Sequence, residues 1–80
     1  MNNLSNSVLR IMEESPLGRM SIYVLRKQSM DAGIDIEEMR SEDLPALVTR
    51  LKDVLPFFLG EGYGGIIMKI KKLNGNQGGS

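Results

Sequence analysis

The sequence predicts a mainly α fold, a compact bundle of three or four helices with short connections. Apolar residues recur at spacings of three and four across residues 44–58, and weaker segments of the same period lie on either side. Breakers such as Pro16 and Gly33 stand where these segments should end. The runner-up is an α+β fold in which residues 20–26 and 65–72 pair as a small hairpin.

The first amphipathic segment begins close to the first residue. Its apolar positions share one helical face and are Leu4, Val8, Ile11 and Met12. Asn3 or Ser5 can cap its start, because both side chains can accept a hydrogen bond from a free backbone N–H. Pro16 disfavours the α region for Ser15, so this helix should end near Glu14.

Residues 18–32 fit both a helix and a strand, because the run around Tyr23 contains β-branched and aromatic residues. We favour a helix, since Gly33 stands where a C-terminal cap is expected and Ile34 stands where the accompanying apolar contact belongs. The segment from Asp35 to Glu38 resembles a capping box and should start a short helical turn.

The third segment has the clearest pattern. Seven apolar residues lie on one stripe of a 3.6-residue period: Leu44, Leu47, Val48, Leu51, Val54, Leu55 and Phe58. Ser41 is the expected cap, and Pro45 falls in the first turn. Pro56 lacks a backbone donor and clashes with the preceding turn, so the helix should kink or end near Leu55. Gly60 should close the segment.

Residues 66–73 can form a short fourth helix, although alternation at Ile66, Met68 and Ile70 also suits a strand. We favour the helix. Residues 1–73 then form one small domain, and residues 74–80, which read NGNQGGS, form a flexible tail.

Composition narrows the class of protein. The 80 residues contain no cysteine and no histidine, so neither disulfides nor an ordinary zinc site can support the small core. Formal net charge is zero, with ten basic and ten acidic residues. The start of the chain does not resemble a secretory signal, and no apolar run could span a membrane. A cytoplasmic protein is expected.

Catalytic and cofactor motifs are incomplete. Residues 60–65 match G-x-G-x-x-G, but a helix precedes them and no βαβ unit follows, so we expect no nucleotide cofactor. Residues 31–42 place acids at some positions of a calcium loop but have Gly33, Ile36 and Glu38 at three positions that require other residues. Without histidine or a thiol, the chain lacks the usual base and nucleophile, and we expect no enzyme and no metal.

Two binding functions remain. The first is a non-catalytic protein-interaction or regulatory module, which would present a helical apolar surface to a protein partner or to a second copy. The expected contact residues are Phe57, Phe58, Leu59 and Tyr63, since the two adjacent phenylalanines cannot both enter one core.

The alternative is a small nucleic-acid-binding protein of the helix-turn-helix kind. Residues 26–36 would form the first helix and turn, the third helix would read the bases, and residues 63–73 could form a β wing. The basic residues assigned to this alternative are Arg50, Lys52, Lys69, Lys71 and Lys72. Acidic residues before the third helix oppose this function, because they repel phosphate.

Overall fold

A computed structural model describes the backbone of residues 1–78 and the side chains of residues 1–73. The α-helices are α1 (Asn3–Glu13), α2 (Ser21–Asp31), α3 (Leu44–Leu59) and α4 (Gly64–Gly78), and the 3₁₀ turns are η1 (Gly18–Met20), η2 (Ser41–Asp43) and η3 (Gly60–Tyr63). The described residues contain no strand. The mainly α prediction is therefore confirmed. The hairpin is wrong, because residues 20–26 lie in η1 and α2 and residues 65–72 lie in α4.

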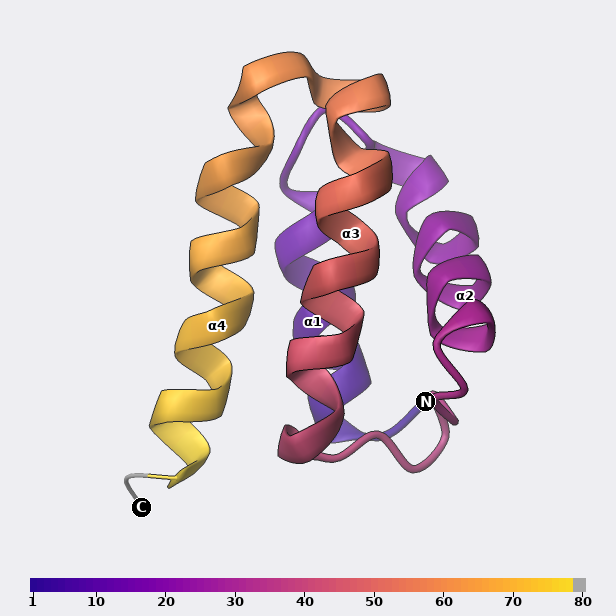
Figure 1. Cartoon of the computed structure of the whole chain (residues 1–80), viewed down its shortest axis with the longest axis vertical. Coiled ribbons are helices and arrows are strands. Elements are labelled where there is room, and N and C mark those ends of the chain that lie inside the picture. Colours follow the sequence, from indigo (N-terminus) through magenta and orange to yellow (C-terminus); the bar gives the residue numbers. More distant parts are fainter. Residues whose placement is uncertain (79–80) are drawn as a thin grey trace.

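The four helices alternate in direction, so that each lies antiparallel to the next along the chain (Figure 1). α1 packs against α2 and α4, and α3 packs against the same two helices. Helices adjacent in sequence are thus neighbours in space, as in other up-and-down bundles. The connections at residues 14–20 and 60–63 meet at one end, and the N-terminus and the α2–α3 connection lie at the other (Figure 1).

α1 is capped by Asn2, and not by Asn3 or Ser5 as expected. The Asn2 side-chain oxygen accepts from the Ser5 backbone N–H at 3.0 Å, and Ser5 Oγ accepts from the Asn2 N–H at 3.0 Å. The same two residues also hold the α2–α3 connection. Asn2 Nδ2 donates to the Met39 carbonyl at 2.8 Å, and Ser5 Oγ donates to the Ile36 carbonyl at 2.7 Å.

Replacing Asn2 by alanine should therefore cost more than an ordinary cap. The loss of the cap costs about 1 kcal/mol, and the loss of the bond to Met39 adds about 1 kcal/mol. We expect Asn2→Ala to lower the free energy of unfolding by about 2 kcal/mol in urea titrations. Asn3→Ala is the matched control, because Asn3 is exposed; an equal loss in both variants would contradict this account.

α2 ends as the sequence predicts. Gly33 adopts a left-handed φ of +73°. Its N–H donates to the Met30 carbonyl at 3.1 Å, and the Ile34 N–H donates to the Ser29 carbonyl at 2.8 Å. This is the Schellman pattern, and buried Ile34 supplies its apolar contact. The expected helical turn at Asp35 is instead an isolated hydrogen-bonded turn, in which the Asp35 carboxylate accepts from the Glu37 N–H at 2.9 Å.

α3 differs from expectation at both ends. It begins at Leu44 after the η2 turn, so Ser41 opens that turn and does not cap the helix. Pro45 lies in the first turn, as predicted. Of the two effects expected of Pro56, an end near Leu55 is wrong, because α3 continues through Pro56 to Leu59, and a kink stays a prediction. Proline removes one backbone bond, but the turn that contains it is anchored by packing of Leu55 and Leu59 against the core.

The fourth segment is helical, as predicted, and longer than expected. Gly60 ends α3 with a φ of +60°, and its N–H donates to the Pro56 carbonyl. η3 then leads into α4, whose backbone is helical to Gly78. The predicted flexibility of residues 74–80 stays a prediction, because the side chains of this segment and residues 79–80 lie outside the described part of the structure.

The core contains side chains from all four helices. Val8 and Met12 of α1, Leu25 of α2, Leu51 of α3 and Ile70 of α4 are completely buried. Five of the seven residues on the predicted α3 stripe are buried: Leu44, Leu47, Val48, Leu51 and Leu55. Val54 is partly buried, whereas Phe58, at the end of the stripe, is half exposed.

Candidate functional site

Large exposed apolar side chains gather on two neighbouring helices. Six such residues occur among the described side chains, and five of them belong to η1–α2 or to the end of α3. We call these five residues the aromatic face: Met20, Tyr23, Met30, Phe57 and Phe58. The sixth, Met68, lies on α4. Single exposed apolar residues are ordinary, whereas an apolar patch on a monomer needs an explanation.

The four residues expected from the sequence to contact a partner divide into two pairs. Phe57 is 88% exposed and Phe58 is 50% exposed, so the turn that contains them presents both rings to solvent. Leu59 and Tyr63 are partly buried and pack against the core. Leu59 and Tyr63 therefore contribute mainly to packing at this end of the bundle and less to its exposed surface.

Met20, Tyr23 and Met30 were not identified from the sequence. They are 50%, 69% and 73% exposed. Tyr23 and Met30 are seven residues apart and share one side of α2, opposite buried Leu25. That spacing was visible in the sequence, but the polar residues Ser21, Gln28 and Ser29 on the buried side concealed which side of α2 enters the core.

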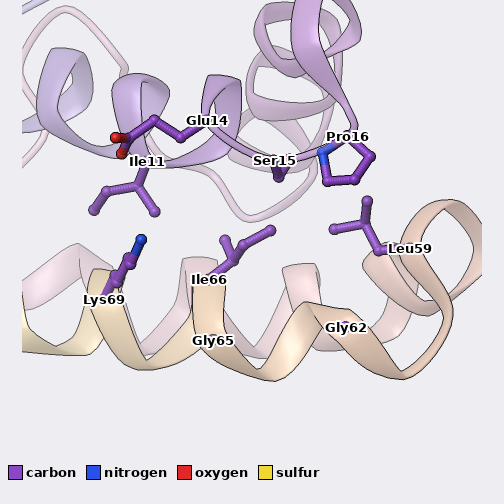
Figure 2. A pocket seen from close by; sticks show the side chains of 9 residues that line it. All are labelled: Ile11, Glu14, Ser15, Pro16, Leu59, Gly62, Gly65, Ile66 and Lys69. Carbon is purple, nitrogen blue, oxygen red and sulfur yellow. The ribbon is translucent and has the colours of Figure 1, made fainter.

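A pocket of about 260 Å³ lies between α1 and α4, at the end of the bundle formed by the connections at residues 14–20 and 60–63 (Figure 2). Ile11, Leu59 and Ile66 point into it and make its surface apolar, and Glu14 and Lys69 reach over one end (Figure 2). A Cβ atom added at Gly65, which lines the pocket, would meet no other heavy atom within 4 Å. The pocket is therefore an open apolar depression of the size of one large side chain.

The glycine-rich segment that matches the nucleotide-binding pattern forms η3 and the first turn of α4. It connects two helices, whereas the phosphate-binding pattern requires a strand before the helix. Gly62 and Gly65 line the apolar pocket.

Of the five basic residues assigned to nucleic acid, Arg50 contacts α2 of its own chain, and its side chain stays 40% exposed. Its Nε donates to Gln28 Oε1 at 3.3 Å, and its Nη2 lies 3.4 Å from Asp31 Oδ2. The other four are exposed lysines on two helices: Lys52 on α3, and Lys69, Lys71 and Lys72 on α4. Lys69 and Lys71 lie on opposite sides of α4, because two helical residues are about 200° apart, so these lysines do not form one surface.

The helix-turn-helix geometry is not formed. Residues 32–43 separate α2 from α3, whereas the motif joins its helices by a turn of about three or four residues. The predicted β wing is wrong, because residues 63–73 lie in η3 and α4.

Arg50 should instead stabilise the bundle. Gln28 is 6% exposed, so Arg50→Ala would leave its side-chain oxygen buried without this donor. We expect the free energy of unfolding to fall by about 1–2 kcal/mol in urea titrations. Lys52→Ala, on the same helix, should change it by less than about 0.5 kcal/mol. Equal effects of the two substitutions would contradict a structural role for Arg50.

Within the described residues, no group of three or more acidic, histidine or cysteine side chains is arranged to hold a metal ion. None of the helices described is long and apolar enough to cross a membrane. The fold and surface define a small all-α domain. No family model, curated protein or solved structure matches the chain.

Proposed function

We propose that this chain is a non-catalytic protein-interaction module that binds through the aromatic face. The observation that carries the proposal is the 88% exposure of Phe57, together with four more exposed apolar side chains on η1, α2 and α3. Burying one aromatic side chain contributes about 1.5–3 kcal/mol. Exposed aromatic residues close together are the usual anchors of protein interfaces.

The absence of histidine and cysteine from the sequence supports the non-catalytic part of the proposal, because these residues supply most bases and nucleophiles. The lack of cysteine also suits a reducing compartment, and we propose a cytoplasmic setting on that basis. Arg50 contacts Asp31 and Gln28 of its own chain, so contact of Arg50 with a phosphate would compete with these two interactions.

Photo-crosslinking from single positions tests the proposal. A photoreactive phenylalanine analogue at position 57 should form a covalent adduct with a protein in the producing cell, identified by mass spectrometry. The same group at position 68 is the matched control, because Met68 is also exposed but lies on α4. Adducts at position 57 alone support the proposal, whereas no protein adduct at position 57, or equal adducts at both positions, overturns it.

Titration with a mixed-sequence duplex at low and high salt tests the alternative. Binding that falls steeply with salt and is lost on replacing Lys52, Lys69, Lys71 and Lys72 would favour nucleic acid. Binding absent at both salt concentrations is the result that the interaction module predicts.

A further inference from the structure

The contacts of Arg50 fix how α2 and α3 are aligned. Arg50 bonds to Gln28 and pairs with Asp31, and the two helices run in opposite directions (Figure 1). Phe57 lies seven residues beyond Arg50, and Ser21 lies seven residues before Gln28. At about 1.5 Å of rise per residue, both displacements are about 10 Å toward the same end of the bundle. Because Arg50 also reaches Asp31, about one turn farther along α2, Phe57 is level with the first turn of α2, residues 21–24.

The same alignment places these residues on one side of the bundle. Phe57 follows Arg50 by two helical turns, so it lies on the side of α3 next to α2. Met20 precedes Asp31 by three turns, so it lies on the side of α2 next to α3. The aromatic face therefore continues across the seam between the two helices, with the partly exposed Arg50–Asp31 pair farther along the seam.

We propose that the partner of the aromatic face is a second copy of this chain, related by a two-fold axis parallel to α2 and α3. This axis places α2 of each copy opposite α3 of the other at the same level. Phe57 of one copy then meets Met20 and Tyr23 of the other, and the reverse contact forms by symmetry. The inference rests on the proposed function and specifies its partner.

The exposed area fits a reversible dimer. With about 200 Å² for each large side chain, the exposed fractions of the five residues on the aromatic face sum to about 660 Å² per copy. If all of this area were covered, two copies would bury about 1,300 Å², close to the lower limit of a standard interface. A small chain without disulfides also gains from this burial, because its own core contributes little net stability.

Charge also fits this arrangement. Asp53 precedes Phe57 by one turn on the outer side of α3, and Lys27 follows Tyr23 by one turn on the outer side of α2. Along the helix axes, Asp53 and Lys27 each lie less than about 5 Å from the level of the Arg50–Gln28 contact, toward the end of the bundle that carries Phe57. The two-fold axis therefore brings Asp53 of one copy opposite Lys27 of the other, twice per dimer. The bond from Lys27 to its own Asp31 is exposed and weak, so the amine is available.

Sedimentation of the purified chain gives the first test. At high concentration we expect a species of twice the 8.9 kDa monomer mass, which dissociates on dilution. Phe57→Glu should weaken self-association by roughly 30-fold, and Tyr23→Glu should weaken it similarly. Met68→Glu is the matched control and should leave it unchanged. Circular dichroism verifies that each variant is folded, as expected for exposed positions.

Charge reversal tests the arrangement itself. Asp53→Lys alone and Lys27→Glu alone each place like charges opposite one another in both pairs, so each variant should be mostly monomeric. A mixture of the two variants pairs the introduced lysine with the introduced glutamate, and native Lys27 with native Asp53, so it should recover the dimer mass. A mixture that stays monomeric while the wild-type chain dimerises overturns the two-fold arrangement.

The outcomes also separate this inference from the proposed function. A wild-type chain that is monomeric at every concentration, with a crosslink from position 57 to a different protein, overturns the second copy as partner and leaves the interaction module standing. A monomeric chain without any crosslink from position 57 overturns both. A crosslinked adduct of twice the chain mass, together with recovery in the mixture, supports both.

Discussion

Leu51→Ala should unfold much of the protein at 25 °C. Leu51 is completely buried at the centre of the α3 stripe, and α3 packs against both α2 and α4. Truncating a buried leucine costs about 2–5 kcal/mol, and a domain of this size has about 3–5 kcal/mol in total. We therefore expect a large loss of helical circular dichroism at 222 nm, or a urea midpoint close to zero.

The control for this substitution is the next residue. Lys52 is exposed on the same helix, so Lys52→Ala should retain the wild-type urea midpoint. If Leu51→Ala unfolded at the same urea concentration as Lys52→Ala, the α3 stripe would not be the centre of the core.

Gly60→Ala should have the largest effect of any glycine substitution at the α3–α4 corner. Gly60 combines a φ of +60° with a ψ of −139°, a conformation that residues with a Cβ atom rarely adopt. The added methyl group meets no other atom within 4 Å, so the cost is backbone strain and not a clash. We expect a loss of about 1–3 kcal/mol, seen as a fall in Tm of roughly 4–8 °C for each kcal/mol.

Gly62→Ala is the matched control for this corner. Gly62 has no positive φ, and a methyl group there also meets open space. Its Tm should stay the same or rise slightly, because alanine restricts the unfolded chain more than glycine. A larger fall for Gly62→Ala than for Gly60→Ala would refute the assignment of strain to Gly60.

The helices were predictable where one physical signal dominated. α3 was clear because its apolar stripe is regular, and the end of α2 was clear because Gly33 supplies a left-handed cap. The end of α3 was not predictable from the local preference of Pro56, because packing of Leu55 and Leu59 outweighs the lost backbone bond. The cap at Asn2 was missed although its reciprocal bonds with Ser5 are local, and its further bonds to the distant residues Ile36 and Met39 have no signature in the sequence.

The candidate site was predictable only in part. Adjacent Phe57 and Phe58 were a local signal, since two neighbouring rings cannot both enter one core. The positions of Met20 and Tyr23 relative to the two phenylalanines depend on how α2 is aligned with α3. The contacts of Arg50 with Gln28 and Asp31 indicate that alignment, and such a tertiary contact has no signature in the sequence. Their place on the surface is a property of the assembled bundle.

Methionine methyl NMR provides the most direct test of the contact surface. In a dilution series of ¹³C-methyl-methionine-labelled chain, Met20 reports on the aromatic face and Met68 reports on α4, away from it. The account predicts that the Met20 methyl resonance shifts with concentration while the Met68 resonance stays fixed, and that Phe57→Glu abolishes the Met20 shift. A Met20 resonance that is unchanged from micromolar to millimolar concentration would contradict the proposed contact between two copies.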